Sequence, residues 1–242
     1  MCASKESCFS AQQVRGYLDR MPNLNTVLFD LDGTLIDSVR LILDSYHHTL
    51  RAHGIPARTD AEWLRGVGTP LRVQFAEWRE HPGIERMIET YREYNLANHD
   101  ACVTPFAGIA DMVRAIKSAG FATGLVTSKN RSGAQRGLRV CEIEPLMDVI
   151  VGADDVEHPK PHAEPVEKAV AYLGADPMRT VYVGDSVHDM ASGRAARVRT
   201  AAVLWGPFTR ADLAPTSPDY WLERPADLLT VLGLEVPRTG RS

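Results

Sequence analysis

Two carboxylates spaced two residues apart, Asp30 and Asp32, have the residue type and spacing best suited to chemistry in this chain. They follow the apolar run from Val27 to Phe29, whose β-branched and aromatic side chains predict a buried strand. The two carboxylates would then lie at the carboxyl edge of a sheet, where open α/β folds bind ligands, and Gly33 lets the backbone turn sharply or approach a ligand. Because like charges this close are costly unless a cation offsets them, the pattern predicts a metal site with a nucleophile beside a proton donor.

Further polar side chains occur where other expected strands end, and one lysine lies in a loop between two prolines. They are Thr127, Ser128, Asp185, Asp189 and Lys160. Parallel strands place their carboxyl ends on one edge of the sheet, so we expect these side chains to converge with Asp30 and Asp32. Carboxylate oxygens bind the hard cation Mg²⁺, while hydroxyl groups, a lysine and backbone amides neutralise a phosphoryl group. The set therefore favours chemistry on a phosphorylated small molecule.

Strands and helices alternate over most of the chain. Apolar runs predict strands at residues 27–29, 122–126, 149–151, 181–183 and 200–204. Helical patterns occupy residues 109–119, 165–173 and 190–196, and glycines close the first two. Five strands with intervening helices predict an α/β fold with a parallel sheet that helices cover on both faces.

A helical segment interrupts this alternation directly after the Asp30 region. From Val39 to Asn98 apolar residues recur at helical spacing, and Ser38 is the expected N-cap of the first helix. The aromatic residues expected to form the core of this segment are Trp63, Phe75, Trp78, Tyr91 and Tyr94. The expected organisation is a helical cap at residues 39–102 that resembles a hinged lid, an α/β core made of residues 23–38 and 103–242, and an N-terminal extension at residues 1–22 with a short helix at 10–20.

Composition argues against several classes of protein. The 242 residues carry a net charge of −4, from 27 basic and 31 acidic residues without a long basic run, so we expect no nucleic-acid or membrane partner. The first twenty residues are polar and no apolar run approaches membrane-spanning length, which argues against a signal peptide or a transmembrane helix. The cysteines form no CxxC pair and favour reduced thiols in a cytoplasmic protein; they are Cys2, Cys8, Cys102 and Cys141.

Four of these segments also form a recognisable series along the chain. They are Asp30-Leu31-Asp32-Gly33-Thr34-Leu35-Ile36-Asp37-Ser38, Val126-Thr127-Ser128-Lys129, Lys160-Pro161-His162 and Val183-Gly184-Asp185-Ser186-Val187-His188-Asp189. In this order they resemble the four motifs of the haloacid dehalogenase-like (HAD) hydrolase superfamily, and the likeness extends from Val27 to about Gly233. The helical segment between the first two motifs is similar to the C1 cap of that family. The resemblance implies a Rossmann-like parallel sheet core with an inserted all-helical C1 cap.

The same resemblance implies roles for the residues of the motifs. Asp30 would be the nucleophile that forms an aspartyl-phosphate, and Asp32 would be the general acid and then the general base. Mg²⁺ would be held by the carboxylates of Asp30 and Asp185, by the backbone carbonyl of Asp32, and by Asp189 directly or through water. The residues expected around the phosphoryl group are Thr127, Ser128, Lys160 and Gly33.

The loop Arg65-Gly66-Val67-Gly68-Thr69-Pro70 is the cap segment expected to contact substrate. Its glycines admit close backbone approach, and Arg65 supplies a guanidinium fork for an anion. An ordinary turn between helices explains the same residues equally well. His162 is expected either to orient the Lys160 loop or to have no role, and Asp154 and Asp155 are expected to cap the next element.

Three reactions fit these motifs. The favoured one is Mg²⁺-dependent hydrolysis of a small phosphorylated metabolite or of pyrophosphate by a monomer or homodimer. Within the phosphatases the sequence resembles the branch of phosphoglycolate phosphatases and bacterial pyrophosphatases, and both substrates stay open. The segments Tyr91-Arg92-Glu93-Tyr94-Asn95 and Pro218-Asp219-Tyr220-Trp221-Leu222-Glu223 are similar to the pyrophosphatase type. A phosphomutase similar to β-phosphoglucomutase shares both aspartates and the cap, and differs only in what reaches the aspartyl-phosphate. Haloacid dehalogenases lack the second carboxylate, so Asp32 argues against that reaction.

Overall fold

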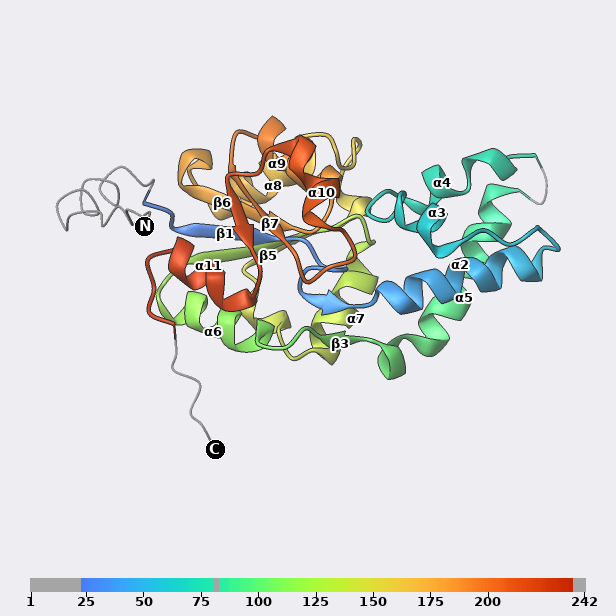
Figure 1. Cartoon of the computed structure of the whole chain (residues 1–242), viewed down its shortest axis with the longest axis horizontal. Helices are drawn as coiled ribbons and strands as arrows, with labels where there is room; N and C mark the ends of the chain where they lie inside the picture. The colour runs from blue at the N-terminus through green and yellow to red at the C-terminus, as the bar shows by residue number, and fades with distance from the viewer. Residues whose placement is uncertain (1–22, 81–82, 237–242) are drawn as a thin grey trace, which may run out of the picture.

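The computed structural model describes residues 23–80 and 83–236, and its centre is a six-stranded sheet (Figure 1). The strands lie in the order β5–β4–β1–β6–β7–β8, and each adjacent pair is parallel. Their bounds are β1 Thr26–Phe29, β4 Ala122–Val126, β5 Val149–Val151, β6 Thr180–Gly184, β7 Arg199–Val203 and β8 Tyr220–Leu222. The predicted α/β fold with a parallel sheet is confirmed. The expected extension at residues 1–22, with its helix at 10–20, lies outside the described residues.

Strand β8 is the one strand of this sheet that the sequence did not predict. It has three residues, Tyr220–Leu222, and lies at the edge, where it pairs only with β7. Two of its three side chains are only partly buried. So short a run shows no periodicity that separates a strand from a loop.

Helices cover both faces of the sheet, because successive side chains of a strand point to opposite faces. Val27 and Phe29 of β1 pack in one apolar cluster with residues of helices α6 (Ile109–Ser118), α7 (Arg131–Val140) and α11 (Pro225–Val231). Leu28 faces the opposite side and packs with residues of α8 (Glu164–Leu173). Helix α9 (Val187–Ala195) contacts α8, β6 and β7 on that side.

Helix α7 was not predicted, because its apolar pattern is weak. Ala134, Gly137 and Leu138 are its buried residues, and most of the others are polar. Asn130 begins the helix, since its side chain accepts a hydrogen bond from the Gly133 N–H (3.2 Å). The short helices of the chain are α10 Arg210–Leu213, η1 Ala76–Trp78, η2 Glu144–Leu146, η3 Ala153–Asp155, η4 Pro177–Arg179 and η5 Ala214–Thr216.

The segment at residues 39–102, which we call the cap, is helical in its described part. It contains α2 (Val39–Ala52), α3 (Asp60–Leu64), α4 (Leu71–Gln74) and α5 (Ile84–Cys102). Helix α2 packs against α5 around a separate apolar cluster, in which the ring of Tyr46 stacks on Trp63 with 4.2 Å between centroids. Trp63, Phe75 and Tyr91 are buried in this cluster, as predicted for the core of the segment, whereas Tyr94 stacks on His48 outside it.

The cap lies beyond the end of the sheet towards which β1 runs (Figure 1). The chain enters it after β2 (Ile36–Asp37) and leaves it before β3 (Thr104–Pro105), and these two strands pair antiparallel. The two connections between cap and sheet are therefore held side by side. The division of the chain into separate cap and core domains stays a prediction. None of the described helices is long and apolar enough to cross a membrane.

Candidate active site

The three central strands each end at a residue that the sequence singled out. Asp30 follows β1, Thr127 follows β4, and Asp185 follows β6. Because β1 lies between β4 and β6, these three residues lie side by side at the carboxyl edge of the sheet. The Asp30 N–H donates to the carbonyl of Val183 (2.8 Å), which continues the pairing of β1 with β6. The structure thus places the polar strand ends together.

Three buried carboxylates, those of Asp30, Asp185 and Asp189, form the centre of the site. Each offers an oxygen that lies within 4.8 Å of the corresponding oxygens of the other two. Thr34 donates its hydroxyl to Asp185 Oδ1 (3.1 Å), but Asp185 Oδ2 is buried without a hydrogen-bond partner among the described residues. A buried carboxylate oxygen without a partner is costly, so this atom is suited to a cation.

The ammonium group of Lys160 is the positively charged partner of two of these carboxylates. Its Nζ lies 2.7 Å from Asp30 Oδ1, 2.6 Å from Asp189 Oδ1 and 3.1 Å from the hydroxyl of Tyr182. Burial alone would lower the pKa of Lys160, but the charges of Asp189 and Asp30 outweigh it and raise that pKa well above its ordinary value. Lys160 is therefore a fixed ammonium group that joins the strand end of β1 to helix α9.

Asp30 and Asp189 share Lys160 as an ammonium partner, Asp185 lies beside them, and the three pKa values reflect this crowding. Burial raises the pKa of Asp30 to about 7, although Lys160 opposes the shift. Burial, and then the charges of Asp189 and Asp30, raise the pKa of Asp185 well above its ordinary value. Burial also disfavours the charged form of Asp189, but Lys160 and the hydrogen bonds from Ser186 bring its pKa below the usual range. An all-oxygen donor set of this kind fits a hard divalent cation such as Mg²⁺.

Asp32 lies outside this buried cluster and faces a cleft. Its Oδ1 accepts hydrogen bonds from Lys129 Nζ (2.7 Å) and from the hydroxyl of Ser38 (2.5 Å). Ser38 does occupy the N-cap position of α2, but its side chain makes no capping hydrogen bond. The predicted N-cap position is therefore confirmed, although the hydroxyl contacts Asp32 and not the backbone of the helix. Neither Lys129 nor Ser38 was given a role at the site from sequence, since their partner is distant in the chain.

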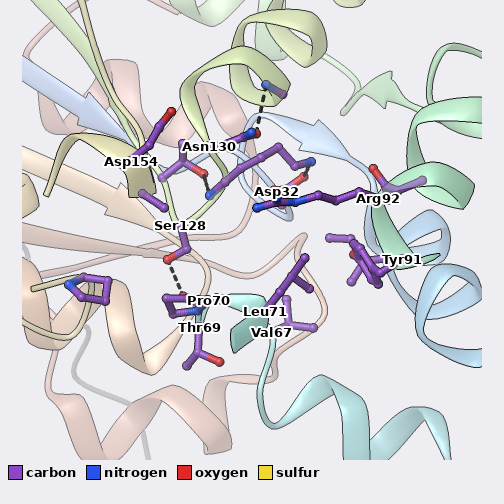
Figure 2. Close-up of a pocket in the computed structure, with 18 of the residues that line it drawn as sticks. Asp32, Val67, Thr69, Pro70, Leu71, Tyr91, Arg92, Ser128, Asn130 and Asp154 are labelled. Carbon is purple, nitrogen blue, oxygen red and sulfur yellow. Dashed lines mark hydrogen bonds and ion pairs between the residues drawn. The ribbon is translucent and has the colours of Figure 1, made fainter. Parts of the chain in front are cut away.

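The cleft lies between the carboxyl edge of the sheet and the cap and has a volume of about 830 Å³. Asp30, Asp32, Thr127 and Asp185 line its core side. Tyr91 and Arg92 of α5 line the cap side and are labelled with Asp32 in Figure 2. Lys160, Asp189 and Gly33 are not among the lining residues; they support the lining carboxylates from behind. The site is thus a polar floor covered by helices.

Ser128 connects the floor of the cleft to the cap. Its hydroxyl donates to the backbone carbonyl of Gly68 (2.5 Å), a contact drawn in Figure 2. The sequence predicted Ser128 as a phosphate-binding residue, but in this structure its hydroxyl is hydrogen-bonded to the cap. Gly68 has a φ of +93°, and a Cβ there would lie 3.3 Å from the hydroxyl oxygen of Ser186. The cap loop therefore packs closely against two strand ends of the core.

Gly33 keeps space for the carboxylate of Asp185. Its φ is +86°, and a Cβ at this position would lie 2.6 Å from Asp185 Oδ2. Both observations require glycine, one through backbone conformation and the other through space. Gly33 therefore positions the cluster.

Replacing Gly33 by Ala should therefore impair catalysis. The methyl group must displace Asp185, and a misplacement of about 1 Å costs about 100-fold in rate, so we expect kcat/KM to fall by about that factor. The control is Gly54→Ala, because Gly54 also has a positive φ (+67°) but nothing lies within 4 Å of the added Cβ. Both variants should lose thermal stability through backbone strain, and Gly33→Ala should lose more because its methyl group also meets Asp185. An equal loss of kcat/KM in both would show that backbone strain, and not displacement of Asp185, is responsible.

The sequence predicted that Arg65 contacts the substrate, and its position in the structure contradicts this prediction. It is exposed at the C-terminal end of α3 and does not line the cleft. The lining residues of that segment come later in the chain and are Val67, Gly68, Thr69, Pro70, Leu71 and Arg72. Part of the expected loop does face the site, but the turn after α3 directs the Arg65 side chain away from it.

Asp154 and Glu164, near the site, accept hydrogen bonds from backbone N–H groups. Asp154 accepts from the N–H of Arg131 (2.7 Å) and so caps α7, which precedes it in the chain, rather than the next element as predicted. Glu164 accepts from the N–H groups of Glu157 and His158 (2.9 and 2.8 Å), and the Glu164 N–H donates to His162 Nδ1 (3.3 Å). These bonds order the turn around Lys160. A role of His162 in orienting Lys160 stays a prediction.

The comparisons with known proteins agree with this fold. A family model of haloacid dehalogenase-like hydrolases matches residues 27–203, and the chain belongs to this family. The pyrophosphatase PpaX of Anoxybacillus flavithermus is 42% identical over 212 residues, which cover 88% of this chain and 98% of that protein. The PpaX of Bacillus cereus is 40% identical over 209 residues, covering 86% and 96%. A solved haloacid dehalogenase-like hydrolase from Bacteroides fragilis has a TM-score of 0.80 at 27% identity, covering 85% of this chain and 99% of that one.

The family assignment confirms the resemblance found in the four motifs. The chain is a hydrolase of this family, in a branch with phosphatases and pyrophosphatases. The relatives align over nearly their whole length, so the likeness includes the cap as well as the sheet.

Proposed function

We propose that this protein is a Mg²⁺-dependent phosphohydrolase that works through an aspartyl-phosphate on Asp30, with inorganic pyrophosphate as its favoured substrate. The observation that carries the mechanism is the position of Asp30. It lines the cleft at a strand end, accepts a hydrogen bond from Lys160, and lies beside the partnerless oxygen of Asp185. The likeness to pyrophosphatases over nearly their full length supports the substrate.

The proposed reaction has two steps. In the first, an oxygen of Asp30 attacks phosphorus, the bond to the leaving oxygen breaks, and Asp32 donates a proton to that oxygen. In the second, Asp32 takes a proton from a water molecule, which attacks phosphorus and releases phosphate from Asp30. Thr127 and Lys160 hold the phosphoryl oxygens in both steps.

The carboxylates of Asp30 and Asp185 would hold a divalent cation, which would offset the repulsion between an anionic nucleophile and a phosphoryl dianion. Asp189 is less available than the other two. Its Oδ1 accepts from Lys160 and Tyr182, and its Oδ2 accepts from the backbone N–H and the hydroxyl of Ser186. We therefore expect Asp189 to position Lys160 and to affect the cation through its negative charge, without contacting it directly.

A phosphate-release screen tests the proposal. Purified protein with Mg²⁺ is offered pyrophosphate, phosphoglycolate, hexose phosphates and other small phosphates, and we expect pyrophosphate to have the highest kcat/KM. A preference for phosphoglycolate would place the protein with the other phosphatases of its branch. Turnover of a hexose phosphate that requires a hexose 1,6-bisphosphate and releases no phosphate would instead show a phosphomutase.

The proposed location is the cytoplasm. Cys102 and Cys141 are both free thiols in the structure, as expected for a reducing compartment.

A further inference from the structure

Five basic side chains line the cleft, and four of them are already paired with carboxylates. The pairs are Lys129 with Asp32 (2.7 Å), Arg136 with Asp100 (2.8 Å), Arg139 with Glu144 (3.8 Å) and Arg72 with Glu85 (2.6 Å). The fifth, Arg92, has no hydrogen bond or ion pair with any residue that the structure describes. Arg92 is thus the one lining cation whose charge is left for something outside the described chain.

The position of Arg92 on α5 directs it into the cleft. Ile88, Arg92, Asn95 and His99 recur at the spacing of one helix face, and all four line the cleft. In Figure 2 the side chain of Arg92 extends from the cap across the cleft towards Asp32.

This arrangement has a direct consequence for the substrate. In the proposed mechanism the phosphoryl group under attack lies at the floor of the cleft against Asp30 and Thr127, so the leaving group must point towards the cap. We infer that Arg92 binds a second anionic group on the leaving side of the substrate. The favoured substrates are then phosphate anhydrides whose leaving group is itself a phosphate, or phosphate esters whose leaving alcohol carries a phosphate or a carboxylate, because a guanidinium fork binds either anion in a bidentate manner. This inference rests on the phosphohydrolase proposed above.

The test compares two substrates in Arg92→Ala. Pyrophosphate has an anionic leaving group, whereas the leaving group of p-nitrophenyl phosphate carries no second acidic group. The ratio of kcat/KM for pyrophosphate to kcat/KM for p-nitrophenyl phosphate should fall about 10- to 100-fold, as expected for the loss of hydrogen bonds between charged partners. Arg92→Lys should give an intermediate ratio, since it keeps the charge but loses the fork.

Arg65→Ala is the matched control. It removes the same charge from an exposed position on the cap that does not line the cleft, so its ratio should stay within about twofold of wild type, as is usual for a surface change. An unchanged ratio in Arg92→Ala, whatever the absolute loss of activity, would overturn the inference. A similar fall in Arg65→Ala would do the same, because it would assign the effect to net charge. A wild-type protein that hydrolyses neither substrate would overturn the proposed function first, and the two failures are therefore distinguishable.

Discussion

Replacing Asp30 by Asn should lower phosphate release by about 10⁴-fold or more, the scale seen when a covalent nucleophile is removed. The amide has almost the shape of the carboxylate but lacks its negative charge and nucleophilic oxygen. Its oxygen can still accept the hydrogen bond from Lys160, and one of three crowded buried carboxylates is neutralised. We therefore expect the melting temperature of this variant to equal or exceed that of wild type. Steady-state kinetics and thermal unfolding measure the two expectations separately.

Asp154→Asn is the control for Asp30→Asn. Asp154 also lines the cleft, but its carboxylate caps α7 through the Arg131 N–H. An Asn side chain can make the same capping bond, so activity should stay within about threefold of wild type. Comparable losses in the two variants would indicate that general charge in the cleft, and not a nucleophile at Asp30, determines the rate.

Removing divalent cations should have the second largest effect. Asp30 and Asp185 have raised pKa values, and Asp30 shares Lys160 with Asp189, so without a cation Asp30 is either protonated and not nucleophilic or charged and repelled by the phosphoryl dianion. We expect EDTA to reduce turnover by about 10³-fold or more and Mg²⁺ to restore it. Undiminished turnover in the presence of the chelator would contradict the proposed mechanism.

Thermal unfolding gives a readout of the cation that does not depend on activity. A ligand at 100 times its dissociation constant stabilises the folded state by about 2.7 kcal/mol, so Mg²⁺ should raise the melting temperature of wild type. Asp185→Asn should lose most of this shift, because it removes the charge next to the partnerless oxygen. A shift of the same size in that variant would place the cation elsewhere.

The floor of the site could be predicted from the sequence because it depends on local rules. A short apolar run followed by Asp30, Thr127 or Asp185 identifies a strand and the residue at its carboxyl end. Parallel pairing of the strands then brings those ends together, whatever their distance in sequence. The same rules predicted five of the six strands of the sheet.

The cap side could not be predicted in the same way. Which residue of a cap helix faces the cleft depends on how α2 and α5 pack and on how the cap sits on the sheet, and neither is a local property. The sequence offers both Arg65 and Arg92 as arginines of the cap. In the structure Arg92 lines the cleft from α5, whereas Arg65 lies at the end of α3 and does not line it. Ser38 and Ser128 were assigned to a helix cap and to phosphate, whereas their hydroxyls contact Asp32 and Gly68.

The central claim is that Asp30 becomes covalently phosphorylated. The most direct measurement is to mix the protein with Mg²⁺ and pyrophosphate, quench in acid within the first turnover, and search the peptides by mass spectrometry. The account predicts one added phosphoryl group on the peptide that contains Asp30, removed by hydroxylamine as expected for an acyl phosphate. Rapid hydrolysis with no such group on that peptide, or a stable group on another residue, would contradict it.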